Sequence, residues 1–133
     1  MRINNILLII SLTSIALSSC TKDNASLSSS YVKWQLIEQL ADPGDGSGIF
    51  EPVTSQKILR LYSSGNFTSN GPMCTMSTSD QQNSSGTFTN DELFPENCIN
   101  YGMSQISYQI SDDTLIINYP CIEACAQKYL KID

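Results

Sequence analysis

The five cysteines are the residues of this 133-residue chain whose spacing points most directly to chemistry. Cys20 follows Leu17-Ser18-Ser19 at the end of an apolar stretch, and Arg2 is the one charge ahead of that stretch. A positive start, a short apolar run and small residues before a cleavage site are the order of a secretory signal peptide, and the run is too short to span a membrane as a helix. Residues 1–19 are therefore predicted to be a signal peptide.

The sequence Leu17-Ser18-Ser19-Cys20 resembles the lipobox of bacterial lipoproteins, in which an aliphatic residue and two small residues precede a cysteine. The resemblance implies that Cys20 becomes the lipidated first residue, so that acyl chains hold the protein to a membrane without a spanning helix. Lipidation would also explain an odd fifth cysteine in an exported chain. The alternative is an ordinary signal peptide that leaves Cys20 as a free thiol.

The residues after Cys20 bear on where the anchored protein resides. Thr21 in place of aspartate resembles the sorting pattern of outer-membrane lipoproteins. Lys22-Asp23 resembles the lysine-plus-acid tether that carries some Bacteroidetes lipoproteins to the cell surface. We therefore expect an outer-membrane lipoprotein, on either the periplasmic face or the cell surface.

The remaining cysteines are an even set, which in an oxidising compartment predicts two disulfides. Its members are Cys74, Cys98, Cys121 and Cys125, for which three pairings are possible. We prefer Cys121 with Cys125, and hence Cys74 with Cys98, because the turn after Pro120 can bring two Cα atoms within the roughly 4.4 to 6.8 Å that a bridge needs. A zinc site is the alternative, but it normally uses two closely spaced pairs, and only one pair is close here.

A second candidate site is the acidic-glycine loop Asp42-Pro43-Gly44-Asp45-Gly46-Ser47-Gly48. Carboxylates and backbone carbonyls in a flexible loop can coordinate Ca²⁺, which makes Asp42 and Asp45 possible calcium ligands, with Glu51 as a third. The spacing does not match an EF-hand. The alternative is a turn-rich connection with solvated acids, and no cofactor is then expected.

Composition excludes several classes of function. The chain has no histidine, the commonest general base near neutral pH and a common metal ligand. No GxGxxG or GxxxxGK[ST] loop is present, so we do not expect an enzyme. The formal net charge is −6, without a basic cluster, and nucleic acid is therefore not an expected partner.

The elements that must position these residues are strands. Residues 20–30 are rich in Ser, Asn, Lys and Asp and predict a flexible tether. Beyond them, apolar and polar residues alternate in short runs between polar turns. The expected strands begin at Tyr31, Lys57, Phe67, Gly86, Ile106, Leu115 and Lys128. Residues 31–133 thus predict one all-β domain, an antiparallel meander of about seven or eight strands that closes into a barrel and hides its edges.

Alternation also predicts which side chains face inward. The large residues expected in the core are Trp34, Phe67, Phe88, Tyr108 and Ile117. On the last strand, Leu130 and Ile132 are expected to face inward. Several bulky inward candidates in a short barrel predict a filled interior rather than a large cavity.

Taken together, these segments resemble a family, the short lipocalin-like lipoproteins of Bacteroidetes, related to the META-type barrel. The matching segments are Trp34-x-Leu36, residues 42–50, Gly65-x-Phe67, Cys74, Gly86-x-Phe88, residues 113–117 and Tyr119-Pro120-Cys121. The resemblance implies a barrel fold and no established activity. The chain is shorter than true lipocalins and lacks their opening Gly-x-Trp signature.

The expected function is that of a non-catalytic, membrane-anchored barrel module. Its loops or open end would engage an envelope protein, a glycan or a small ligand. The alternative is a lipocalin-type carrier that holds a small ligand in an internal pocket.

Overall fold

The computed structural model describes residues 30–96, 98 and 106–133. The predicted signal peptide, Cys20 and residues 21–29 of the tether lie outside the described residues. The described residues form nine strands and no helix, and so no helix among them has the length and apolarity to cross a membrane. The strands are β1 (Tyr31–Ala41), β2 (Glu51–Pro52), β3 (Ile58–Tyr62), β4 (Asn66–Ser69), β5 (Ser84–Phe88), β6 (Glu92–Pro95), β7 (Ile106–Ser111), β8 (Thr114–Asn118) and β9 (Cys125–Ile132).

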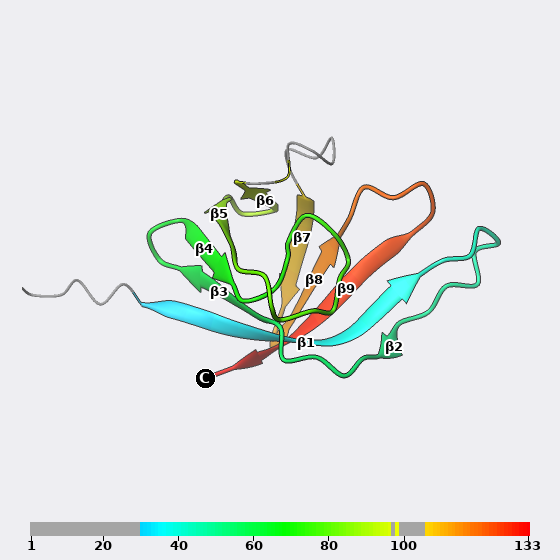
Figure 1. Cartoon of the computed structure of the whole chain (residues 1–133), viewed down its shortest axis with the longest axis horizontal. Coiled ribbons are helices and arrows are strands. Elements are labelled where there is room, and N and C mark those ends of the chain that lie inside the picture. The colour runs from blue at the N-terminus through cyan, green and yellow to red at the C-terminus, as the bar shows by residue number, and fades with distance from the viewer. Residues whose placement is uncertain (1–29, 97, 99–105) are drawn as a thin grey trace, which may run out of the picture.

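The strands form one closed antiparallel sheet (Figure 1). Each strand from β3 to β8 pairs with the next one along the chain, and β1 closes the ring by pairing with both β3 and β9. Eight strands therefore make the barrel, and β2 pairs with the second half of β1 outside the ring. The predicted all-β barrel is confirmed.

Because neighbouring strands are antiparallel, each connection lies at one or the other end of the barrel. At one end, which we call the short-turn end, β1 begins, β9 ends, and short turns join strands at residues 63–65, 89–91 and 112–113. At the other end, which we call the loop end, lie the long described connections, residues 42–57, 70–83 and 119–124. Candidate sites predicted in connections thus gather at the loop end.

A β-bulge at Ile37 changes which side chains of β1 face inward. The pairing of β1 with β9 shifts by one residue at this point. Because a one-residue shift reverses the alternation, Glu38 faces outward and pairs with Lys128 of β9. The next residue, Gln39, faces inward opposite Gln127. The bulge thus keeps a carboxylate out of the barrel interior.

The core is built from the inward faces of the barrel strands. Trp34, Phe67, Tyr108 and Ile117 are buried as predicted, and Phe88 is partly buried against them. The prediction of which β9 side chains face inward is wrong, because Tyr129 and Gln127 are fully buried whereas Leu130 is 42% exposed.

Gly86 is the position where the barrel wall tolerates no side chain. It lies opposite Phe67, and a Cβ added to it would sit 2.2 Å from the Phe94 carbonyl oxygen and 2.7 Å from the Phe67 ring. We therefore expect Gly86→Ala to lower the free energy of unfolding by about 1 to 3 kcal/mol, the usual cost of overpacking. Denaturant unfolding measures this change.

The matched control is Gly46→Asn, at a loop position where an added Cβ meets nothing within 4 Å and where asparagine tolerates the positive φ of +75°. Equal effects of the two substitutions would contradict the close approach at Gly86.

Candidate functional site at the loop end

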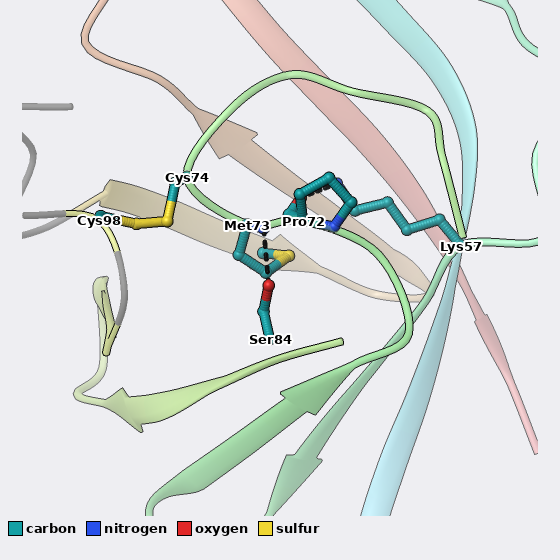
Figure 2. The surroundings of a disulfide bond; sticks show 6 residues. All are labelled: Lys57, Pro72, Met73, Cys74, Ser84 and Cys98. Atoms are coloured by element: carbon teal, nitrogen blue, oxygen red, sulfur yellow. Dashed lines mark hydrogen bonds between the residues drawn. A yellow bond between two sulfur atoms is a disulfide. The ribbon is translucent and has the colours of Figure 1, made fainter. Parts of the chain in front are cut away.

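The connection of residues 70–83, between β4 and β5, passes across the loop end of the barrel (Figure 1). Met73 is fully buried in the core, and its backbone N–H donates to Ser84 Oγ at 3.1 Å. The next residue, Cys74, forms a disulfide with Cys98, and Figure 2 shows these contacts side by side. The chain thus closes this end of its own barrel with a covalently tied loop.

Lys57, just before β3, is fully buried and reaches this loop from the barrel wall (Figure 2). Its Nζ donates to the carbonyl oxygens of Pro72 at 2.7 Å and Ser77 at 3.1 Å, and to Oε1 of Gln127 at 3.1 Å. An ammonium group has three donors, so each has an acceptor here. Because Pro72 and Ser77 belong to one loop, Lys57 fastens both ends of residues 72–77 to the barrel. Gly71 makes room for it, since a Cβ there would lie 2.7 Å from Lys57 Cγ.

Gln127 is the centre of the buried polar network. Its Oε1 accepts hydrogen bonds from Lys57 and from the hydroxyls of Tyr119 at 3.1 Å and Tyr129 at 2.8 Å. Its Nε2 donates to Gln39 Oε1 and the Ser77 carbonyl, both at 3.2 Å. These partners determine the orientation of the amide. Within the described part of the chain, Trp34 Nε1 is the one buried side-chain N or O atom without a partner.

No carboxylate takes part in this network. Burial is therefore the main cause of the pKa shifts of its ionisable groups. Burial lowers the pKa of Lys57 from its usual 10.5 to about 7. Burial also raises the pKa of both Tyr119 and Tyr129 above the ordinary value of a phenol. The two hydroxyls therefore stay neutral and Lys57 is the one group in the network that titrates near neutral pH.

The alternation of β3 could have revealed that Lys57 is buried, because it is separated by an even number of positions from Leu59 and Leu61, whose side chains face inward. Sequence reasoning missed it because lysine is rarely buried without a partner.

A cavity of about 400 Å³ opens at the loop end beside this network. It lies between the end of β1, residues 74–76 of the loop and the connection from β8 to β9. Its lining is mainly apolar and includes Ala41, Met76, Tyr119, Pro120 and Ala124. Asp42 and Glu123 contribute the two carboxylates of the lining. A size of a few hundred cubic ångströms and an apolar lining with few polar groups are typical of binding sites.

Both predicted disulfides form and both border the cavity. Cys74 and Cys98 have Cα atoms 5.1 Å apart, and those of Cys121 and Cys125 are 6.1 Å apart. Cys74, Cys121 and Cys125 line the cavity. The zinc alternative is wrong, because all four sulfur atoms are in disulfide bonds.

The acidic-glycine loop is ordered by its own backbone. Asp42 Oδ1 accepts the N–H groups of Gly44 at 2.7 Å and Gly46 at 3.1 Å, and Oδ2 accepts that of Gly48 at 2.7 Å. These hydrogen bonds lower the pKa of Asp42 below its usual value. Asp45 accepts the Ser47 N–H at 2.9 Å, and hydrogen bonds from Ser47 lower its pKa too.

The two carboxylates that were predicted as calcium ligands are thus engaged with N–H donors. Glu51, the third candidate, lies on β2. In residues 30–96, 98 and 106–133 no three His, Cys, Asp or Glu side chains gather in a way that could hold a metal ion. Calcium binding remains a prediction of the sequence.

The loop end also exposes apolar side chains. Ile122, in the turn that Cys121 and Cys125 bridge, is 101% exposed, and Ile49 in the connection of residues 42–57 is 68% exposed. Isolated exposed apolar residues are common, but Ile122 stands on a bridged turn that also walls the cavity.

Charge is distributed unevenly along the barrel. The acids of the three long described connections, residues 42–57, 70–83 and 119–124, are Asp42, Asp45, Glu51, Asp80 and Glu123. The described cations are Lys57, which is buried, Lys128, which pairs with Glu38, and Lys33, Arg60 and Lys131 on β1, β3 and β9. The described loop-end connections thus carry carboxylates and no exposed cation.

Comparisons with protein-family models, with curated proteins and with solved structures found no match for this chain. The architecture itself defines the class: an all-β antiparallel barrel of eight strands with one strand outside it, consistent with a lipocalin-like fold.

Proposed function

We propose that this protein is an exported, outer-membrane lipoprotein whose non-catalytic barrel engages a partner in the cell envelope through its loop end. The supporting observation is the division of the barrel into two unlike ends. The long described connections, the cavity and both disulfides are at one end, and the chain enters at the other.

The position of the chain entry supports an orientation. Ser30 lies at the short-turn end, where its carbonyl accepts the Ser63 N–H at 2.9 Å. Cys20 precedes Ser30 by ten residues, which span at most roughly 36 Å. A lipid on Cys20 would therefore tether the protein through its short-turn end, which favours a loop end that is free to meet a partner.

The filled interior supports engagement of a partner over transport of a cargo. Core side chains, Met73 and the bonded pair Lys57 and Gln127 occupy the space that a lipocalin-type carrier keeps for its ligand. The cavity beside them is bounded by loops rather than by the barrel centre. We further propose kinship with the META-like barrel lipoproteins of Bacteroidetes, which the closed meander supports.

Site-specific photocrosslinking in cells tests this proposal. A photoreactive residue replaces Ile122 at the loop end, or Asp112 at the short-turn end as the matched control. We expect a discrete envelope adduct from position 122 and none from position 112. In the Cys20→Ser variant, the protein should leave the membrane fraction. Adducts from both positions alike, or from neither, would contradict a docking role for the loop end, and unchanged membrane retention would contradict the anchor.

A further inference from the structure

We infer that the loop-end cavity receives a basic, apolar segment of a partner protein, with an apolar side chain in the cavity and Lys or Arg residues beside Asp42 and Glu123. This inference rests on the proposed function and adds the chemistry of the partner.

The shape and lining of the cavity indicate an apolar side chain. At about 400 Å³, its volume is near the lower limit of small-ligand sites. Met76, Tyr119 and Pro120 line it together with the Cys121–Cys125 bridge. Thioether and disulfide sulfur atoms are polarisable and pack well against aliphatic and aromatic groups. The exposed Ile122, on the bridged turn beside the cavity, adds apolar contact surface.

The charges around the cavity indicate that the segment is basic. Asp42 lines it, and three backbone N–H groups keep this carboxylate ionised. Glu123 lines it from the opposite connection and lies beside Gly44 of the acidic loop. The described loop-end connections carry no exposed cation that would compete for these carboxylates. Such a surface attracts cations and repels acidic proteins and anionic lipids.

Disulfides and hydrogen bonds hold the walls of the cavity in place in the absence of a partner. The Cys74–Cys98 bridge and the Lys57 hydrogen bonds hold residues 72–77, and the Cys121–Cys125 bridge closes the facing turn. Asp42 holds the acidic loop through its N–H contacts. A preformed surface avoids the entropic cost of ordering its loops on binding, so a short segment can bind measurably.

Fluorescence anisotropy with the full mature chain in detergent tests the inference. The probes are three labelled peptides of equal length: one alternating Lys and Leu, one with Glu in place of Lys, and one with Ser in place of Leu. We expect the Lys–Leu peptide to bind at least about tenfold more tightly than the other two. Raised ionic strength should weaken its binding.

Variants locate the site. Met76→Arg, which fills the cavity with a cation, should weaken binding of the Lys–Leu peptide by about tenfold or more. Glu123→Lys, at an exposed position that does not threaten folding, should weaken it severalfold. Asp112→Asn at the short-turn end should leave it unchanged.

Three outcomes would overturn the inference: equal binding of the Lys–Leu and Lys–Ser peptides, equal binding of the Lys–Leu and Glu–Leu peptides, or binding that Glu123→Lys does not alter. If the Ile122 position still crosslinks an envelope partner under those outcomes, the proposed function stands and only the partner chemistry is wrong. If neither peptide binding nor crosslinking is found, both are wrong.

Discussion

Replacing Cys74 and Cys98 together with serine is expected to lower the free energy of unfolding by about 3 to 4 kcal/mol. The bridge joins residues 24 apart in sequence, so it removes loop-closure entropy from the unfolded chain. It also ties down the loop that carries the fully buried Met73. Denaturant unfolding under oxidising conditions measures the difference, and the double substitution avoids a free thiol.

The second bridge provides the matched control. Cys121 and Cys125 are only 4 residues apart, so the same model assigns their bridge about 2 kcal/mol. Serine at both of these positions should therefore destabilise the protein less than serine at Cys74 and Cys98. An unchanged midpoint in the Cys74→Ser, Cys98→Ser variant, or a larger loss from the short bridge, would contradict this ranking.

The barrel could be predicted because its strands alternate clearly. Tyr108 and Ile110 pair with apolar partners on β8 in the alternating pattern from which the hairpin was predicted, and the register is continuous from Ser107 to Ser111. Strand β6 escaped prediction because Glu92–Pro95 is short and ends in proline. The predicted inward face of β9 was wrong because a polar residue, Gln127, occupies an inward position. Hydrophobicity alone therefore favours Leu130 as an inward residue.

Only part of the candidate site could be predicted from the sequence. The cysteines predicted both bridges, because their even number implies pairing and the turn after Pro120 favours a bridge between Cys121 and Cys125. The cavity could not be predicted, because three connections far apart in sequence, with Asp42, Met76 and Tyr119 among their residues, build its walls. Burial of Lys57 likewise depends on carbonyls of a loop whose path is set by packing.

Raising the pH from 7 to 9 is expected to stabilise the protein by about 2 to 3 kcal/mol, because of Lys57. In the unfolded chain its amine binds a proton until the pH approaches 10.5, whereas in the folded protein its pKa is about 7. Between these values the unfolded state binds more protons, so unfolding becomes less favourable as pH rises, by up to about 1.4 kcal/mol per pH unit. Below pH 7 the lysine is protonated in both states and this contribution to the pH dependence ends.

Above pH 10 the trend should reverse. Burial raises the pKa of Tyr119 and Tyr129, so these phenols ionise in the unfolded chain before they do so in the folded protein. The folded state then binds more protons, and stability falls as pH rises. Stability should therefore pass through a maximum between about pH 9 and 10, which urea unfolding at a series of pH values would reveal.

Lys57→Met separates this mechanism from general effects of pH. Methionine keeps the apolar stem beside Gly71 and removes the titrating group, so the rise between pH 7 and 9 should disappear. The slope is the decisive quantity, because the substitution also removes the Nζ hydrogen bonds to Pro72 and Ser77 and alters stability at every pH. Lys131→Met, at an exposed lysine, should keep the rise. A flat profile in the unmodified protein, or a rise that survives Lys57→Met, would show that burial of this lysine does not govern the pH dependence.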